Sequence, residues 1–240
     1  MWSVEIESLN AELARRFVKA QLRITPAGLA LARLDSNEQP LLINFADGAH
    51  TYRRLHGGGR GQPIAKALGL AKYKEPPRII DATAGIGQDS FVLASLGATV
   101  IAIERNPIVA ALLQDALLRA QAHPDVSDIA SRIVLLKSDA HLTMAKVALD
   151  QHPIDIVYLD PMFPHRSKSA LVKKELRILR DIVGDDADAD ALLQQALKSA
   201  AKVVVKRPKI APYLNAQKPD RQWLGERNRF DIYLQPTLPG

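Results

Sequence analysis

The chain has 240 residues, of which 47% are hydrophobic and 24% are charged, and its formal net charge is +6. This length suits one large α/β domain with a modest appendage, and no apolar run approaches the roughly 18 residues that a membrane span requires. The chain contains no cysteine, which excludes disulfides, cysteine-based metal sites and any thiolate nucleophile. The first residues are acidic where a secretory signal would be basic, so we expect a cytoplasmic protein without membrane association.

Residues 1–70 predict a small α+β extension that ends in a basic, glycine-rich loop. Short apolar stretches at 29–32 and 41–45 are separated by turn signals. Between residues 48 and 74 the chain has six Lys or Arg and no acidic residue. The glycines at 57–61 allow the backbone to approach a ligand closely, and arginines bind phosphates well. We therefore predict an RNA contact or substrate lid, with a solvated face as the alternative, through Arg53, Arg54 and Arg60.

From residue 71 onward, strand and helix patterns alternate. Apolar runs predict strands at 78–83, 99–104, 133–137, 154–160, 202–206 and 230–234. Helical patterns predict helices at 89–96, 107–123, 169–182 and 188–201, the second of them starting at Asn106-Pro107. Such alternation predicts an α/β, Rossmann-like domain over residues 71–240, with a mostly parallel, doubly wound sheet covered by helices on both faces.

Polar residues follow the predicted strands at the edge where ligands of open α/β sheets bind. These residues are Asp81, Glu104, Ser138, Asp139 and Asp160. After Asp81 comes a turn with Gly85 and Gly87, whose lack of side chains lets the backbone approach a cofactor. Glu104 can accept hydrogen bonds from ribose hydroxyls, and Ser138-Asp139 can bind an adenine edge. The sequence therefore predicts a nucleotide-type cofactor in this pocket.

The charge of the glycine turn favours S-adenosylmethionine over a nicotinamide cofactor. The third glycine of the dinucleotide fingerprint is missing, and Asp89 stands where the following helix begins. A pyrophosphate is a poor neighbour for that carboxylate. A sulfonium and an ammonium group are better neighbours, because Asp81 and Asp89 would then face positive charge.

The segment Asp160-Pro161-Met162-Phe163 predicts methylation of an amino group on a nucleic-acid base. An exocyclic amine is a poor nucleophile, so its hydrogens must be held by acceptors and its nitrogen aligned with the methyl group. The Asp160 carboxylate and the Pro161 carbonyl can accept those hydrogens, and Phe163 can stack on a base taken out of its helix. Asp160, Pro161 and Phe163 are therefore the predicted catalytic residues. Carbon-5 methylation of a pyrimidine is disfavoured, because it needs a cysteine.

Further charged residues fall downstream of this motif. Candidate contacts to the RNA backbone are His165, Arg166, Lys168, Lys173, Lys206 and Arg207. An acidic cluster over 181–190 lacks the glycine and glutamate positions of a calcium loop, and we interpret it as helix caps and surface. The six histidines show no zinc-ligand spacing, so we expect no metal site.

Several of these segments together resemble the RsmJ family. They are the segments 57–61, 81–95, 104–107, 158–165, 168–174, 203–208 and 230–233. The resemblance covers about residues 45–235 and implies a class I S-adenosylmethionine-dependent methyltransferase that needs no metal. It implies that the substrate is the N2 amine of one guanosine in 16S ribosomal RNA, free or within the small subunit. It also implies cofactor contacts by Gln88-Asp89, Glu104-Arg105, Ser138-Asp139 and Asp160.

Other functions remain open on the sequence. A DNA adenine-N6 methyltransferase uses the same amino chemistry, although 240 residues leave little room for a target-recognition domain. A non-catalytic RNA-binding module on the same fold would not need a cofactor, so the intact acidic and glycine positions argue against it. A small-molecule methyltransferase is less favoured, because it would not need the basic segments.

Overall fold

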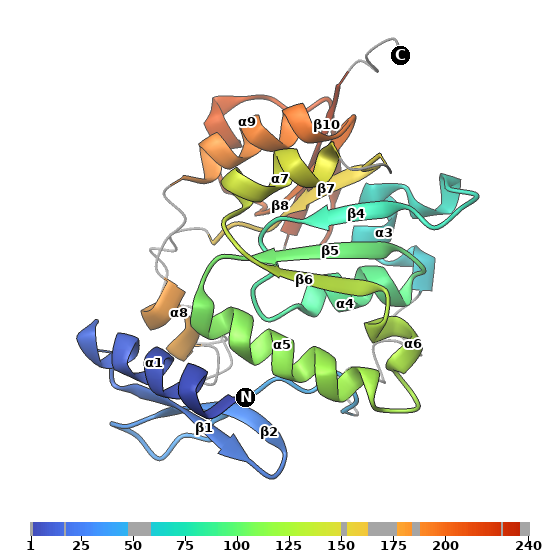
Figure 1. Cartoon of the computed structure of the whole chain (residues 1–240). Coiled ribbons are helices and arrows are strands. Elements are labelled where there is room, and N and C mark those ends of the chain that lie inside the picture. Colours follow the sequence, from blue (N-terminus) through green and yellow to red (C-terminus); the bar gives the residue numbers. More distant parts are fainter. Residues whose placement is uncertain are drawn as a thin grey trace.

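The fold is taken from a computed structural model of the chain. The structure describes residues 2–16, 18–47, 59–149, 153–162, 177–183, 188–226 and 228–235. Figure 1 shows one large sheet with helices packed on it and a smaller helix-and-sheet unit formed by the N-terminal segment.

The N-terminal segment forms the predicted small α+β extension. It consists of a helix and a three-stranded antiparallel sheet in the order β1-β2-β3, namely α1 (Trp2–Arg15), β1 (Ala20–Thr25), β2 (Gly28–Arg33) and β3 (Leu41–Leu42). Strand β2 lies against the long helix α5 (Pro107–Gln121). Leu22 and Leu31 of the small sheet belong to the same hydrophobic cluster as Leu112 and Leu117 of α5. Burial of these side chains attaches the extension to the main domain.

The large sheet has seven strands in the order β6-β5-β4-β7-β8-β10-β9. They are β4 (Arg78–Asp81), β5 (Thr99–Glu104), β6 (Ile133–Lys137), β7 (Ile156–Leu159), β8 (Lys202–Pro208), β9 (Arg221–Leu224) and β10 (Asn228–Leu234). The first five strands of that order pair in parallel, and β10 pairs antiparallel with both β8 and β9. This arrangement confirms the predicted mostly parallel, Rossmann-like sheet.

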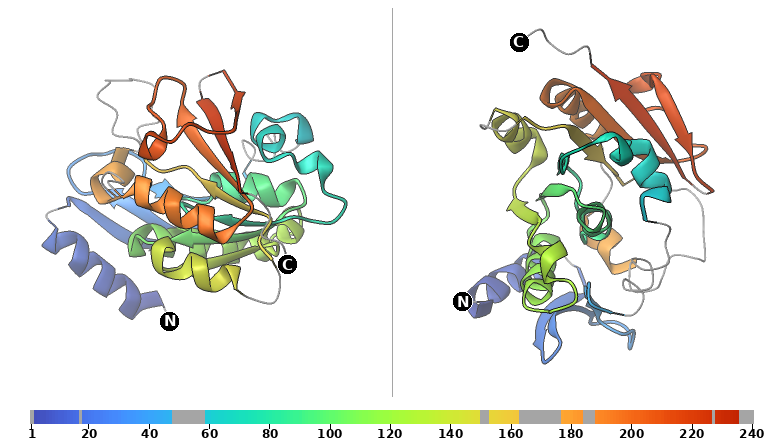
Figure 2. Two further views of the ribbon diagram at one scale, coloured as in Figure 1. Left: turned by 90° about the horizontal axis from the view of Figure 1, so that it is seen from above. Right: turned by 90° about the vertical axis from the view of Figure 1, so that its right-hand side faces the viewer.

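Helices cover both faces of the large sheet, as Figure 2 shows. One face carries α3 (Pro63–Leu68), α4 (Gln88–Ser95), α5 and α6 (Ser127–Ala130), and the other carries α7 (Ala140–Ala148) and α9 (Ala189–Ser199). Successive strand residues alternate between the two clusters, for example Ile79 with the first and Ile80 with the second. Both faces are thus apolar, which explains the continuous apolar runs of the central strands.

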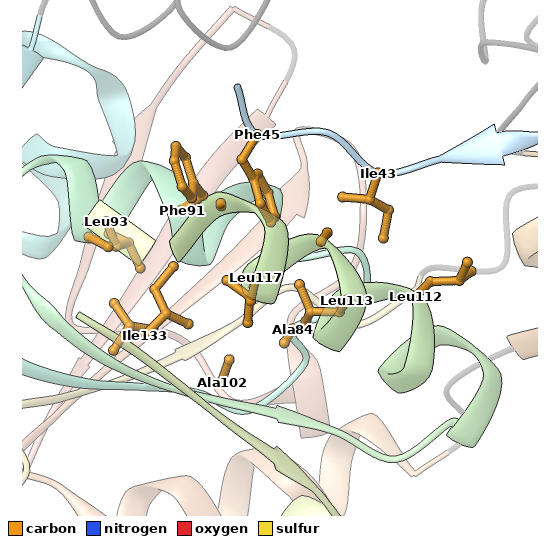
Figure 3. Packing of buried hydrophobic residues seen from close by; sticks show 14 of the residues in the cluster. Ile43, Phe45, Ala84, Phe91, Leu93, Ala102, Leu112, Leu113, Leu117 and Ile133 are labelled. Carbon is orange, nitrogen blue, oxygen red and sulfur yellow. The ribbon is translucent and has the colours of Figure 1, made fainter. Parts of the chain in front are cut away.

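The hydrophobic core on the α4–α5 face also anchors the end of the N-terminal extension. Figure 3 shows Phe45 beside Phe91 of α4, above Leu113 and Leu117 of α5. The two phenylalanine rings stack with centroids 4.4 Å apart and an angle of 4° between their planes. Phe45 is 1% exposed. The short segment after β3 is therefore held by an aromatic pair in the main core.

The start of α5 follows the predicted cap. The Asn106 side chain accepts hydrogen bonds from the backbone N–H groups of Ile108 and Val109 at 3.0 and 3.3 Å, and Pro107 occupies the first turn. This cap fixes the helix directly after Glu104, which ends β5. It therefore also positions the edge of the sheet where the predicted ligand residues lie.

Some elements differ from the sequence-based expectation. The patterns did not indicate α3, α6, α7 or β9. The helix expected at 169–182 is described only over α8 (Arg177–Val183), and its first part lies outside the described residues. Within the described residues, short 3-10 turns occur at Gly59–Gly61, Leu70–Lys72 and Leu214–Ala216. The boundary drawn at residue 70 stays a prediction, although α3 contacts β9 and β10 of the large sheet.

Candidate active site

The carboxyl ends of β4, β5 and β7 meet where the strand order reverses, between β4 and β7. A cavity of about 370 Å³ opens at this edge, within the size range of small-molecule sites. The predicted residues that line it are Asp81, Gly85, Gln88, Asp89, Glu104, Arg105, Asp139, Asp160 and Lys206. Gly87 and Ser138 are not among the lining residues. The fold therefore gathers most of the predicted cofactor residues around one cavity.

The two glycines between β4 and α4 have different tasks. Gly85 has φ +55°, and a Cβ there would meet no atom within 4 Å, so its backbone borders open space. Gly87 has φ +75°, and a Cβ there would lie 2.5 Å from Leu113 Cδ1 and 3.2 Å from Phe45 Cζ. Gly85 thus leaves room for a ligand. Gly87 serves packing, because it allows α4 to approach α5, and the cofactor contact predicted for it stays a prediction.

Asp81 is buried beneath the glycine turn, with 1% of its surface exposed. The Ser90 hydroxyl donates to Asp81 Oδ2 at 2.5 Å, and the Thr83 backbone N–H donates to Oδ1 at 3.3 Å. Burial raises the pKa of Asp81 to about 7, the nearby Asp89 and Asp160 carboxylates act in the same direction, and the two hydrogen bonds oppose the rise. Asp81 therefore holds the turn and contributes a negative charge that a cationic ligand would stabilise.

Glu104 connects the glycine turn to the start of α5. Its Oε2 accepts the Gly85 backbone N–H at 2.8 Å, and its Oε1 accepts the Asn106 backbone N–H at 2.7 Å. The side chain is 7% exposed and lines the cavity. A carboxylate has about four acceptor positions. Glu104 is therefore oriented by the backbone and can also accept hydrogen bonds from ribose hydroxyls, as predicted.

An ion pair closes the cavity on the side of α9. Arg105 Nη1 lies 2.6 Å from Asp188 Oδ2, and His141 Nε2 lies 3.2 Å from the same oxygen. The hydrogen bond from Arg105 lowers the pKa of Asp188, while partial burial opposes it. Asp188 is the N-cap residue of α9 and Asp190 lies in its first turn, as the interpretation of the acidic cluster as caps and first turns expects. The Asp188 side chain, however, accepts no N–H of the helix and pairs with Arg105 instead. Nothing in the sequence connected the acidic cluster with Arg105.

The third strand end contributes through the start of α7. Asp139 Oδ1 accepts the backbone N–H of His141 at 2.8 Å, so it caps this helix and also lines the cavity. The Ser138 hydroxyl shares a hydrogen bond with the Thr143 hydroxyl at 2.5 Å. Ser138 therefore stabilises the first turn of α7, and the adenine contact predicted for it stays a prediction. His141 also lines the cavity. The sequence analysis did not predict it, because it lies two residues after the strand-end pair Ser138-Asp139.

Asp160 lies directly after β7 in a network of polar side chains. Its backbone N–H donates to the Thr83 hydroxyl at 2.6 Å, which fixes the chain directly before Pro161. Lys206 Nζ lies 2.9 Å from Asp160 Oδ2 and 2.7 Å from Asp89 Oδ2. The Tyr158 hydroxyl donates to Asp89 Oδ2 at 2.6 Å. Two carboxylates from different elements thus share one ammonium group in the wall of the cavity.

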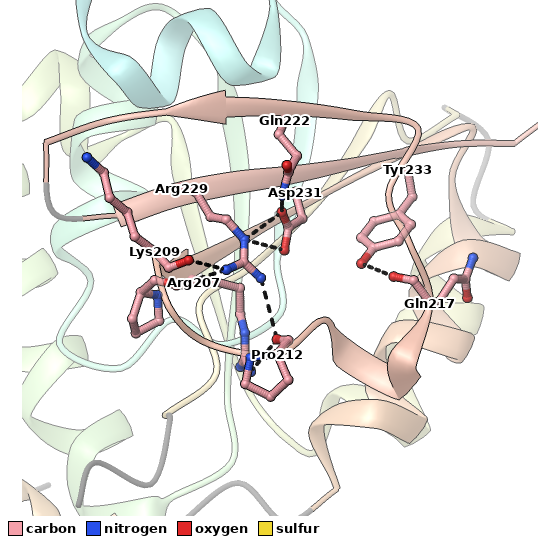
Figure 4. Close-up of polar contacts among 9 residues, drawn as sticks. Arg207, Lys209, Pro212, Gln217, Gln222, Arg229, Asp231 and Tyr233 are labelled. Carbon is pink, nitrogen blue, oxygen red and sulfur yellow. Dashed lines mark hydrogen bonds and ion pairs between the residues drawn. The ribbon is translucent and has the colours of Figure 1, made fainter.

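The structure corrects the RNA contacts predicted for β8. Lys206 faces the cavity and pairs with site carboxylates, so its ammonium group does not lie on an outer rim. Arg207 points to the opposite face and is 4% exposed, with its Nη2 donating to the Pro212 carbonyl at 3.2 Å. Figure 4 shows it beneath the paired Arg229 and Asp231. Burial excludes a direct phosphate contact by Arg207 in this conformation.

The remaining predicted site residues are described to different extents. Pro161 is described and buried directly after Asp160. The side chain of Arg60 is not described, although its backbone belongs to the turn at Gly59–Gly61. The residues that lie outside the described ranges are Arg53, Arg54, Phe163, His165, Arg166, Lys168 and Lys173.

Among the described residues, no group of three or more His, Cys, Asp or Glu side chains is arranged to hold a metal ion. Within the same ranges, no helix has the length and apolar character to cross a membrane.

The residues of the cavity fit S-adenosylmethionine. Gly85 leaves space for a ligand beside the turn, where Asp81 and Asp89 provide negative charge. Glu104 offers acceptors suited to ribose hydroxyls, and Ile103, Ala140 and Leu192 provide apolar surface farther along the wall. A cationic methionine portion and an apolar, planar adenine match this division of charge.

The comparisons with known proteins agree with this site. Residues 8–235 match the family of SAM-dependent methyltransferases. A crystal structure of a SAM-dependent methyltransferase from Neisseria gonorrhoeae is similar, with a TM-score of 0.73 and 36% identity, covering 92% of this chain and 84% of that one. The protein is therefore an S-adenosylmethionine-dependent methyltransferase of the Rossmann-like class.

Full-length relatives define the family more closely. Ribosomal RNA small subunit methyltransferase J of Aeromonas hydrophila is 50% identical over 240 residues, covering 98% of this chain and 95% of the relative. The protein of the same name from Pseudomonas aeruginosa is 49% identical over 219 residues, covering 90% and 83%. The chain belongs to the ribosomal RNA small subunit methyltransferase J family, which confirms the resemblance seen in its motifs.

Proposed function

We propose that this enzyme transfers a methyl group from S-adenosylmethionine to the N2 amine of a guanosine in the ribosomal RNA of the small subunit. The observation that carries the proposal is the position of Asp160-Pro161 at the rim of a cofactor-type cavity, directly after β7. Relatives that match this chain over most of its length are named for ribosomal RNA of the small subunit. Such a substrate would be encountered in the cytoplasm, as naked RNA, an assembly intermediate or a finished subunit.

The residues directly after β7 would hold the amine for in-line attack. When bound, S-adenosylmethionine supplies an electrophilic methyl carbon on a positive sulfur. Transfer to the N2 lone pair would leave the electrons of the broken carbon–sulfur bond on sulfur. The Asp160 carboxylate and the Pro161 carbonyl accept the N2 hydrogens and orient the lone pair. The surplus proton leaves N2 for water after transfer, so no strong base is needed beforehand.

The rigid support of Asp160 is suited to this task. Its backbone is tied to Thr83 on the neighbouring β4 turn, and its carboxylate is tied to Lys206 on β8. Electrostatic alignment is effective when the acceptors are held before the substrate arrives. Phe163 would stack on the target base, and Arg53, Arg54 and Arg60 would bind RNA phosphates. These last roles rest on residue type and position in the chain.

Adenine-N6 methylation of DNA is the second candidate, because Asp160-Pro161 would serve an adenine amine in the same way. It is less favoured because relatives that match nearly the whole of this chain are named for ribosomal RNA of the small subunit. A non-catalytic RNA-binding role is the third candidate. It would leave the cavity and the fixed Glu104 carboxylate without a purpose.

The test is transfer of labelled methyl from S-adenosylmethionine to small ribosomal subunits lacking the modification, followed by nucleoside mass spectrometry. We expect N2-methylguanosine at one position. N6-methyladenosine would establish the second candidate, and cofactor binding without incorporation into any RNA would support the third. The Asp160→Ala variant should fold normally but lose transfer. Normal turnover by this variant would reject the assigned site.

The RNA surface needs a separate test. Replacing Arg53, Arg54 and Arg60 by Ala should weaken RNA binding and flatten its dependence on salt, since each phosphate contact adds to the salt slope. A matched control replaces Arg15, Arg23 and Arg132, which are part of α1, part of β1 and next to β6. Equal effects of the two triple variants would reject a specific role for the glycine-rich loop.

A further inference from the structure

Lys206 is the only cation among the described residues that line the cavity near the methyl-acceptor motif, and it lies between two carboxylates. Its Nζ is 2.7 Å from Asp89 Oδ2 and 2.9 Å from Asp160 Oδ2. Its side chain is 23% exposed and borders the cavity, so it is neither a surface charge nor sealed in the core. A group in this position can bind both the protein and a ligand.

The charges around Lys206 keep it protonated. Partial burial lowers the pKa of Lys206, but Asp160 and Asp89 raise it more, and the net pKa lies above the usual value. For Asp160, burial raises the pKa and Lys206 lowers it, while Asp89 opposes Lys206, so the net pKa is raised. The Tyr158 hydroxyl donates a hydrogen bond to Asp89, and Asp81 lies close enough to Asp89 and Asp160 for their charges to interact. Lys206 therefore stays protonated and can donate hydrogen bonds beside Asp160.

The hydrogen-bonding capacity of this pair exceeds its internal use. A lysine ammonium group has three donors, and within the described part of the chain Lys206 donates to Asp89 and Asp160. One donor therefore remains for a ligand. An ionised carboxylate has two acceptor oxygens, and the hydrogen bond from Lys206 uses Oδ2 of Asp160. At the cavity wall the pair therefore offers one hydrogen-bond donor, on Lys206, and two acceptor oxygens, on Asp160.

We infer that Lys206 and Asp160 together recognise the Watson–Crick edge of the acceptor guanine. This edge presents, side by side, the O6 acceptor, the N1–H donor and the N2 amine. The Lys206 ammonium group would donate to O6, while the Asp160 carboxylate accepts N1–H and one hydrogen of N2. The inference rests on the proposed function, because it assumes that the acceptor is a guanine N2.

The same pair rejects adenine. Adenine presents an amine where guanine has O6, and its N1 is an acceptor without hydrogen. The adenine amine would face the Lys206 ammonium group, and the N1 lone pair would face the Asp160 carboxylate. Sites built to bind one hydrogen-bond pattern discriminate strongly against a base that leaves buried polar groups unpaired. Lys206 is thus a specificity-determining residue in addition to a positioning residue for Asp160.

The test compares guanine with 2-aminopurine at the acceptor position of the RNA. 2-Aminopurine keeps the amine at C2 but lacks O6 and the hydrogen on N1. We expect the wild-type enzyme to prefer guanine by kcat/KM. In Lys206→Met, transfer to guanine should fall by roughly 10- to 100-fold, as for a lost hydrogen bond to a charged group, while transfer to 2-aminopurine should fall much less. The preference should therefore collapse.

Two further variants make the result decisive. Lys206→Arg keeps a cationic donor and should retain the preference for guanine. Lys198→Met removes an exposed lysine from the last turn of α9 and should behave like wild type. If Lys206→Met lowers transfer to both bases equally, Lys206 only supports Asp160 and the recognition role is overturned. If Lys206→Met does not fold, loss of the preference in Lys206→Arg would overturn that role, and retention would support it.

This experiment separates the two proposals. Transfer by the wild-type enzyme to guanine N2 with an unchanged guanine preference in Lys206→Met would reject the inference and keep the proposed function. Absence of any transfer to guanine N2 by the wild-type enzyme would reject the proposed function itself. Cofactor binding measured by calorimetry for each variant checks that the cavity remains intact.

Discussion

Asp81 gives the clearest quantitative prediction, because its ionisation is coupled to folding. The carboxyl group is buried under the glycine turn, and burial raises its pKa from 3.8 to about 7. A group with a raised pKa binds its proton more tightly in the folded state than in the unfolded state. Its contribution to stability is therefore complete below pH 3.8 and is lost as the pH rises to about 7.

The magnitude follows from this difference in pKa. A change from 3.8 to about 7 corresponds to about 4 kcal/mol between the acidic and alkaline limits. Asp81→Asn cannot ionise and escapes this penalty. We therefore expect the stability of the variant, relative to wild type, to increase by about 3 kcal/mol between pH 4.5 and pH 8. The comparison between two pH values removes the constant cost of fitting an amide beside Ser90.

The assay is urea unfolding of the cofactor-free protein at both pH values. Asp128→Asn is the control, because it removes a carboxylate that is 66% exposed and pairs with Arg132 in the same helical region. The control should change its stability relative to wild type by less than about 1 kcal/mol between the two pH values. Parallel stability curves for wild type and Asp81→Asn would refute the reasoning. S-adenosylmethionine should reduce the difference, because its positive charge favours the ionised form of Asp81.

Three further outcomes are expected. Gly87→Ala should destabilise the protein by roughly 1–3 kcal/mol in urea unfolding, because the new Cβ would press on Leu113 at a positive φ; an unchanged midpoint would contradict this packing. Phe45→Ala should cost roughly 3–5 kcal/mol through loss of its stack on Phe91, whereas Phe45→Leu should cost less; equal losses would contradict the role of the ring. Lys206→Met should move the acidic limb of kcat/KM to higher pH, because the carboxylate at the end of β7 loses the ammonium group that lowers its pKa; a fixed limb would argue that another group controls it.

The sequence predicted the strands that carry apolar residues on both faces of the sheet. The runs at Arg78–Asp81 and Thr99–Glu104 are strands as expected, because buried parallel strands need apolar residues at nearly every position. Ile133–Lys137 is also a strand as expected, although it lies at the sheet edge with only Ile133 buried. The order of polar residues after these strands also predicted the cofactor edge. The carboxyl ends of parallel strands lie together in any such sheet, so Asp81 and Glu104 had to approach each other.

Elements at the edge of the fold were not predictable in this way. Arg221–Leu224 forms β9 with all four residues exposed, so no alternation of apolar and polar residues marks it. Its pairing with β10 supplies the backbone hydrogen bonds that define it. Helix α7 was missed for a related reason, because only Ala140 and Met144 of its residues are buried.

The partners of charged side chains were decided by the tertiary structure. The sequence places Asp89, Asp160 and Lys206 far apart, and a basic residue in a nucleic-acid enzyme is naturally assigned to phosphates. The pairing of β7 with β8 brings Lys206 to Asp160, and the packing of α4 on the sheet adds Asp89. Arg105 and Asp188 meet in the same manner. Residue type and strand order determined where the chemistry lies, whereas long-range packing decided which charges neutralise each other, because Coulomb energy depends on distance in space and not on separation along the chain.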